Sequence, residues 1–238
     1  MKKVLSTLLI IVLLFSSVSA IAADSEKIYD EYDMQLSFLN ELGIIDSSSI
    51  PTAGRTFTRG EFAVMAAKLL GERASSGHKA PFMDVDADSE FASSINLLVD
   101  EGCITGNPDG TFRPGEYIAP EEAVKILVEM LGYGPYAKVL GGYPLGYYKA
   151  ADKIELTWGA YPRNETTVES IIKLLYNALH TPMLDVSSIS TDGEIHYQSA
   201  DGSDETGKTL LSAYFDIYYT EGIFESTSTS SLYYNRAA

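Results

Sequence analysis

The chain has 238 residues, of which 45% are hydrophobic and 21% charged. Most of it is therefore expected to fold around a buried core, and collagen-like, coiled-coil and wholly disordered classes are excluded. It carries 17 basic against 33 acidic side chains, a net charge of −16, which repels phosphate backbones and argues against nucleic-acid binding. The lone Cys103 excludes an internal disulfide, and with three scattered histidines it predicts no metal or cofactor site.

The first 22 residues have the pattern of a secretory signal peptide. Lys2 and Lys3 precede a mostly apolar run over 5–18, and small residues follow, so cleavage is expected after Ala20 or Ala22. The run is short and serine-rich for a membrane span, and no second apolar run of spanning length follows it. We therefore predict a secreted protein with no membrane span after cleavage. The alternative is an uncleaved N-terminal anchor.

A first helix–loop–helix block is predicted over 30–72. Leu36, Leu39 and Leu42 recur at helical spacing, which indicates a helix over 32–42. A polar loop then leads to Phe57-Thr-Arg-Gly-Glu61 and to a second helix over 62–70, which ends at Gly71.

The second block, over 80–133, opens with Phe82-Met-Asp84 and continues into a predicted helix over 90–100. The loop that follows contains Asn107-Pro-Asp-Gly110, a combination typical of a tight turn in which Gly110 takes a positive φ. A second helix is predicted over 120–131.

The third block, over 141–184, is predicted to hold helices over 148–156 and 167–179. Its second helix can begin in two registers. One makes Thr166 and Glu169 a capping box, and the other, one residue later, aligns Lys173 with Lys125. Blocks that recur at about 50 to 60 residues are an internal repeat, and three such units can share one core.

The composition changes after residue 184. Residues 185–208 are rich in Ser, Thr, Asp and Gly, with one short alternating run over 194–198. A helix over 209–219 and a strand over 221–225 are predicted beyond it. We interpret 185–238 as a linker and the start of a further module.

The second block resembles the S-layer homology repeat. The residues that carry the resemblance are Phe82-Met-Asp84, Gly102-Cys-Ile-Thr-Gly106, Asp109-Gly-Thr-Phe-Arg-Pro114 and Ile118-Ala-Pro-Glu-Glu122. Block one matches the helix-entry motif at Phe57-Thr-Arg-Gly-Glu61, and block three is similar to the third repeat of clostridial-type envelope proteins.

The resemblance implies an all-α, pseudo-threefold bundle of three repeats, followed here by a short, partly β tail. It also implies a non-catalytic module at the cell wall or S-layer surface. Such modules bind an anionic, often pyruvylated, secondary cell-wall polysaccharide in grooves between repeats, through the helix-entry arginine. Neighbouring envelope proteins are further partners. The alternative is a structural or protein-interaction module that keeps the fold and has lost the sugar site.

Arg59 is the main candidate for ligand binding. Thr58 and Glu61 form a predicted capping box, and a helix N-terminus presents N–H groups and partial positive charge. An anion held there would meet those N–H groups and the guanidinium of Arg59 together. The alternative is an exposed arginine paired with Glu61 or Glu72. Blocks two and three have no arginine at this position.

Four further candidates lie in the second block, and each has a structural alternative. Asp84 either caps a turn or faces the groove, Asp109 and Gly110 either form a turn or contact ligand, and Arg113 either contacts ligand or braces the loop against Asp84 or Glu116. Trp158 and several tyrosines between Tyr133 and Tyr148 either stack on sugar rings or fill gaps between helices. The sequence shows no catalytic constellation, so we predict no enzymatic activity, and a hydrolase fragment is the least favoured hypothesis.

Overall fold

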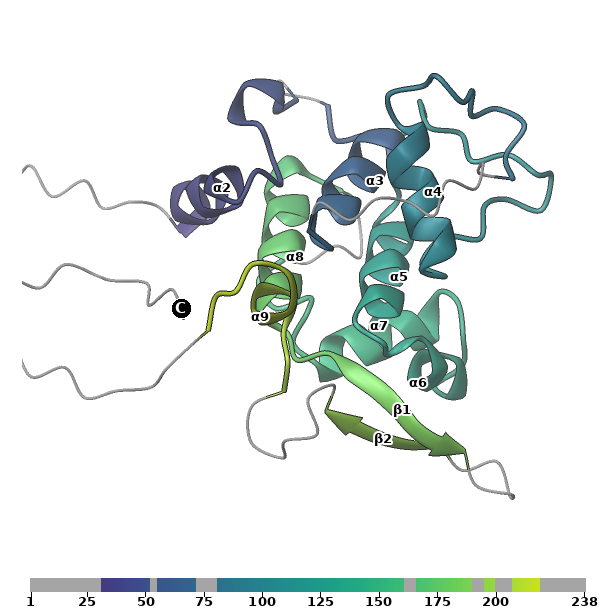
Figure 1. The fold of residues 1–238 in the computed structure, drawn as a ribbon, viewed down its shortest axis with the longest axis vertical. Coiled ribbons are helices and arrows are strands. Elements are labelled where there is room, and N and C mark those ends of the chain that lie inside the picture. Colours follow the sequence, from purple (N-terminus) through teal and green to yellow (C-terminus); the bar gives the residue numbers. More distant parts are fainter. Residues whose placement is uncertain are drawn as a thin grey trace, which may run out of the picture. The chain divides into compact units, whose positions relative to one another are not determined.

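Helices are the main secondary structure in the part of the chain that the computed structural model describes, namely residues 31–51, 55–71, 81–160, 166–189, 195–199 and 207–218 (Figure 1). The mostly helical class is therefore as predicted. The helices are α2 (Glu31–Glu41), η1 (a 3₁₀ turn, Ser47–Ser49), α3 (Arg59–Lys68), α4 (Ala92–Asp100), α5 (Pro120–Met130), α6 (Gly134–Val139), α7 (Leu145–Lys153), α8 (Val168–His180) and α9 (Leu210–Tyr214).

The chain divides at Met34, and every contact described below lies within the unit Gln35–Ala238. The predicted signal peptide lies outside the described residues. Among the described residues, none of the helices combines the length and the apolar composition needed to cross a bilayer. The arrangement of the three blocks as a pseudo-threefold bundle stays a prediction.

Helix α5 lies at the centre of the packing. It contacts α3, α6, α7 and α8, while α4 packs against α3 (Figure 1). The core side chains of α5 and α8 are fully buried, among them Leu127, Leu131, Ile171 and Leu174. These residues recur at three- and four-residue spacing, which places them on one face of each helix. These buried faces are where α5 and α8 meet their neighbours.

Helix α5 ends next to the start of the C-terminal segment. Gly132 follows it with φ of +86°, and a Cβ at this position would overlap the carbonyl oxygen of Leu184. The N–H of Leu184 in turn donates to the carbonyl oxygen of Leu131 at 2.9 Å. Only glycine combines this backbone conformation with so close an approach.

The region from residue 134 into the first half of the third block differs from the prediction. Helix α6 was not predicted, and α7 begins at Leu145 rather than at residue 148. The two helices pack so closely that a Cβ on Gly146 would overlap the carbonyl oxygen of Ala137. Helix α8 settles the register left open above: Thr167 is its N-cap and Ser170 completes the capping box, so Lys173 aligns with Lys125.

The C-terminal segment forms a hairpin and a short helix. Strands β1 (Leu184–Ile189) and β2 (Ile195–Ser199) pair antiparallel, where a linker was predicted around one alternating run. Helix α9 is shorter than predicted and packs on α8 through the fully buried Leu210 and Leu211. A bridge between Pro182 and Thr209 joins the segment's two ends. The strand predicted over 221–225 lies outside the described residues.

Candidate ligand-binding site

The first turn of α3 has the predicted capping box. The hydroxyl of Thr58 accepts from the N–H of Glu61 at 3.2 Å, and the Glu61 carboxylate accepts from the N–H of Thr58 at 2.7 Å. Two of the donors that a helix N-terminus leaves unpaired are thereby satisfied within the motif.

The other N–H groups of this turn are not available to a ligand. Arg59 N–H donates to the carbonyl oxygen of Glu116 at 2.8 Å, and Gly60 N–H donates to that of Pro114 at 2.9 Å. Thr58 also forms a β-bridge with Tyr117. The prediction that this helix tip offers open amides to an anion is therefore wrong. The reason is that the loop of the second block supplies backbone carbonyls to the same groups.

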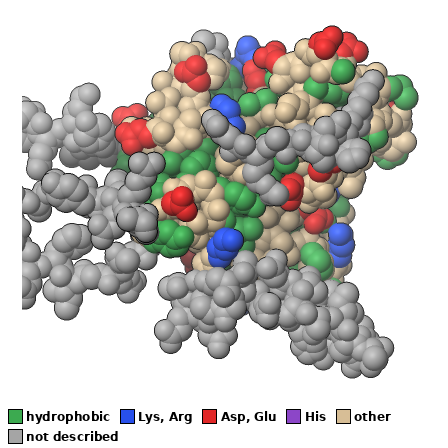
Figure 2. All heavy atoms as spheres, viewed as in Figure 1, with side chains coloured by type: hydrophobic (Ala, Val, Ile, Leu, Met, Phe, Trp, Pro, Cys, Tyr) green, Lys and Arg blue, Asp and Glu red, His purple; other side chains and the backbone are tan. Residues whose placement is uncertain are grey.

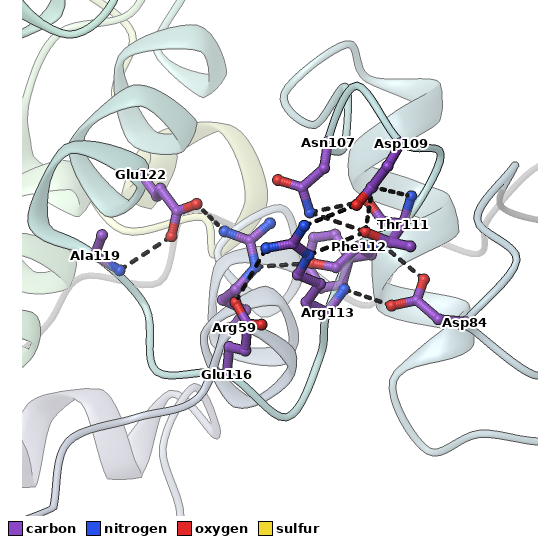
Figure 3. A network of polar contacts seen from close by, with 10 residues as sticks. All are labelled: Arg59, Asp84, Asn107, Asp109, Thr111, Phe112, Arg113, Glu116, Ala119 and Glu122. Carbon is purple, nitrogen blue, oxygen red and sulfur yellow. Dashed lines mark hydrogen bonds and ion pairs between the residues drawn. The ribbon is translucent and has the colours of Figure 1, made fainter.

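The guanidinium of Arg59 is buried and paired. Its Nε donates to the carbonyl oxygen of Phe112 at 2.8 Å, its Cζ lies 4.8 Å from the centroid of the Phe112 ring, and Nη1 pairs with Oε1 of Glu122 (Figure 3). Arg59 is only 8% exposed. Its partner is thus Glu122, a residue of the next block, rather than Glu61, while Glu72 lies outside the described residues.

Glu122 serves two contacts at once. Its Oε2 accepts from the N–H of Ala119 at 3.0 Å, which closes the first turn of α5, while Oε1 binds Arg59. At the matching positions of α8, the first-turn residue is Val168 and the capping residue is Ser170. Helix α5 has Pro120 where α3 has Arg59, so it has no arginine at the first helical position. Helix α8 has neither the arginine nor the glutamate of the motif.

The carboxylate of Asp84 binds backbone N–H groups of the loop in the second block. Its two carboxylate oxygens accept from the N–H groups of Phe112 at 2.8 Å and Arg113 at 2.7 Å (Figure 3). The Phe-x-Asp motif thus binds the chain that carries Phe112, whose ring in turn lies against Phe82, with centroids 5.6 Å apart. This is the loop-supporting alternative rather than a side chain aimed at a groove.

Asp109, Gly110 and Arg113 brace the same loop from outside. The Asp109 carboxylate accepts from the N–H and hydroxyl of Thr111, at 3.0 and 2.5 Å, and from Nη2 of Arg113 at 2.7 Å. The bond from the Thr111 hydroxyl, followed by that from Arg113, lowers the pKa of Asp109 to about 2. Arg113 also pairs with Glu116 at 3.8 Å, and Gly110 takes the predicted positive φ, +79°.

A pocket of about 380 Å³ opens beside Arg59. It lies between the start of α3, the loop after α4, the first turns of α5 and the segment before α7. Of the six predicted site residues, Arg59 alone lines it; Thr58, Asp84, Asp109, Gly110 and Arg113 are not among the lining residues. Those are Arg59, Cys103, Ile104, Thr105, Gly106, Asn107, Pro108, Phe112, Glu122, Lys125, Ile126 and Tyr143.

Lys125 is the basic side chain of this pocket that the sequence analysis missed. Its Nζ donates to the hydroxyl of Thr105 at 3.1 Å. The signal was present: Lys125 and Lys173 both lie six positions after the N-cap of their helix. In the third block, Nζ of Lys173 lies 5.2 Å from the centroid of the Trp158 ring, which is 71% exposed.

The remaining pocket chemistry is apolar and phenolic. Burial, followed by the charges of Glu121 and Glu122, raises the pKa of Tyr143 to about 12, so its hydroxyl stays protonated and can donate. Burial also raises the pKa of the Cys103 thiol to about 12, which keeps it unreactive. Two cations, one carboxylate and a phenol around apolar walls suit a small polar ligand that carries negative charge.

Comparison with known proteins agrees with this organisation. The family model of the S-layer homology domain matches residues 81–128, which include the loop and first turns of α5 that line the pocket. The chain is 26% identical over 211 residues to the "Middle cell wall protein" of Brevibacillus brevis, an overlap that covers 85% of this chain and 19% of that protein.

Two further relatives cover smaller overlaps. The "Surface layer protein" of Brevibacillus choshinensis is 27% identical over 169 residues, 69% of this chain and 14% of that protein. "S-layer protein EA1" of Bacillus anthracis is 42% identical over 69 residues, 29% of this chain and 8% of that protein. The chain thus spans less than a fifth of the length of these curated relatives. It is a protein with an S-layer homology domain, over residues 81–128.

Proposed function

We propose that this chain is a non-catalytic anchoring module, exported to the cell surface, which binds an acidic sugar of a secondary cell-wall polysaccharide in the pocket beside Arg59. The observation that carries the proposal is the placement of Arg59 and Lys125 on one pocket, whose other lining residues, Tyr143 apart, lie in the segment that matches the S-layer homology domain. The relatives named above are cell-wall and surface-layer proteins, which favours the same location.

The charge distribution makes this pocket selective for local, rather than extended, negative charge. The chain as a whole carries −16, and on the face in Figure 2 the basic side chains lie in separate spots among acidic and hydrophobic ones. A uniformly charged polymer such as a nucleic acid is therefore repelled. A polysaccharide that presents one carboxylate on a largely neutral ring, as a pyruvyl ketal does, carries less charge per unit length, so it is repelled less, and its single carboxylate can lie beside the pocket cations.

The test is sedimentation of the mature chain with purified cell-wall sacculi, compared with sacculi stripped of their secondary polysaccharide. Wild type is expected to pellet with the former only. Lys125→Met removes the ammonium but keeps the apolar stem, so it should lower the pelleted fraction at least about fivefold, the effect of losing one charge-assisted contact. Lys153→Met, which changes an exposed lysine outside the pocket, is the matched control.

Pelleting that is equal on intact and stripped sacculi would overturn the polysaccharide as ligand. Equal loss in the Lys125 and Lys153 variants would overturn the pocket as its site. The second candidate function is a protein-interaction module that keeps the fold, and the specific observation in its favour is that Arg59 is already neutralised by Glu122. It predicts no polysaccharide-dependent pelleting by wild type.

A further inference from the structure

We infer that Glu122 is an internal competitor for the ligand carboxylate, and that it sets the affinity and charge selectivity of the pocket. The inference rests on the proposed function, because it concerns the same pocket. Glu122 and Arg59 both line that pocket, and the carboxylate of Glu122 is bound to the guanidinium that an acidic sugar would need. The ligand must therefore take Arg59 from a partner that is covalently part of the protein.

The geometry makes this exchange feasible. The side chain of Glu122 is 28% exposed, whereas that of Arg59 is 9% exposed and fixed by Phe112 from two directions. The arginine thus stays in place, and the carboxylate is the partner that can leave. When it does, Oε2 still closes the first turn of α5 through Ala119, so the helix keeps its cap. Leaving therefore breaks one contact of Glu122 and not both.

The charge balance gives the selectivity. With Glu122 in place, the pocket's lining carries two cations and one carboxylate, a net charge of +1. A neutral sugar gains nothing from displacing Glu122, whereas a carboxylated sugar replaces one ion pair by another and also meets Lys125. Glu122 therefore weakens binding of every acidic ligand while leaving neutral ligands unaffected. Glu122 thus affects ligand specificity indirectly, by occupying and positioning the guanidinium of Arg59.

The variant that separates these roles is Glu122→Gln. Glutamine still serves in a capping box, but only one of its two terminal atoms is an oxygen. With that oxygen on the N–H of Ala119, its NH₂ group faces the guanidinium of Arg59 and cannot accept from it. The cap is kept and Arg59 is released. Glu61→Gln is the matched control, because Glu61 caps α3 in the same way and does not line the pocket.

The experiment is calorimetric titration of the mature chain with a methyl hexopyranoside that carries a pyruvyl ketal, and with the same methyl hexopyranoside without the ketal, which is neutral. Glu122→Gln should bind the pyruvylated sugar about three- to tenfold more tightly than wild type, the range for one close charge pair. Glu61→Gln should match wild type. The gain should vanish when Arg59→Met is added, and it should be absent for the neutral sugar.

The outcomes separate this inference from the proposed function. Binding by Glu122→Gln but not by wild type supports the competitor and overturns wild-type anchoring through this pocket. Equal or weaker binding by Glu122→Gln, with wild type binding normally, overturns the competitor and leaves the proposed function standing. Binding by neither chain overturns both. A gain that persists without Arg59 also overturns the inference, because the effect would not act through the guanidinium.

Discussion

Asp84 and Asp109 hold the loop of residues 106–114 from its two sides. Asp84 binds backbone N–H groups, and Asp109 binds the side chains of Thr111 and Arg113. Both were candidates for ligand contact, and both carboxylates are used inside the protein. The loop that they fix carries Asn107 and Phe112 to the pocket, so their part in any binding is to shape its wall.

The pKa of Asp109 tests this bracing directly. The Thr111 hydroxyl is the largest cause of its lowering to about 2, so Thr111→Val should raise the pKa towards 3.8. Because the folded-state value is depressed, the stabilisation is present above about pH 4 and is lost as the pH falls through about 2. An NMR titration of the Asp109 carboxyl carbon measures the pKa. The control is Thr105→Val, which removes a hydroxyl that contacts Lys125 and should leave the pKa of Asp109 unchanged. An unchanged pKa in Thr111→Val would contradict the assignment.

Residue-level partners were the least predictable part of the site. The capping box of α3 was predictable because its members are three positions apart and act locally. The pairing of Arg59 with Glu122 joins residues 63 positions apart and depends on how two blocks pack. For the same reason, nothing in the local sequence showed that Glu116 and Pro114 would take the N–H groups of the α3 tip.

Elements were predicted more closely than contacts. The boundaries of α5 and α8 fall within about one residue of the predicted ones, because apolar spacing and end residues are encoded locally. Helices α6 and α7 were missed or shifted because Gly134-Pro135 and Gly141-Gly142 resemble turns. Their helical state depends on the close approach of Gly146 to Ala137, which is a tertiary contact.

Helix α5 differs from α3 and α8 in its N-cap, and this gives a prediction for element stability. Ala119 has the extended backbone of an N-cap but no side chain that can accept, whereas Thr58 and Thr167 accept in the other two helices. Ala119→Thr should therefore be more stable than its isostere Ala119→Val by about 1 kcal/mol. Urea denaturation midpoints of the two variants measure the difference. Equal midpoints would mean that Glu122 alone already supplies the cap.

The charge of the whole molecule sets how it meets an acidic polymer. At about 10 mM salt the Debye length is about 30 Å, so the net charge of −16 repels the polymer before the pocket is reached; at about 150 mM it is about 8 Å. The association rate on immobilised wall polysaccharide should therefore rise over this range, as surface plasmon resonance can measure. A steady fall with salt would show that attraction by the pocket dominates at long range. In Lys125→Met the association rate should rise with salt in the same way, while the dissociation rate should be faster than in wild type.

The bridge between Pro182 and Thr209 has a mechanical consequence. Because the two ends of the hairpin segment are joined there, and α9 rests on α8 through Leu210 and Leu211, tension applied at residue 218 passes from α9 to α8 without stretching β1 and β2. Once α9 detaches from α8 and the bridge between Pro182 and Thr209 breaks, the hairpin segment is free to extend. A molecule under tension would then lengthen by the chain length of the hairpin segment before the force acted on the helices around the pocket.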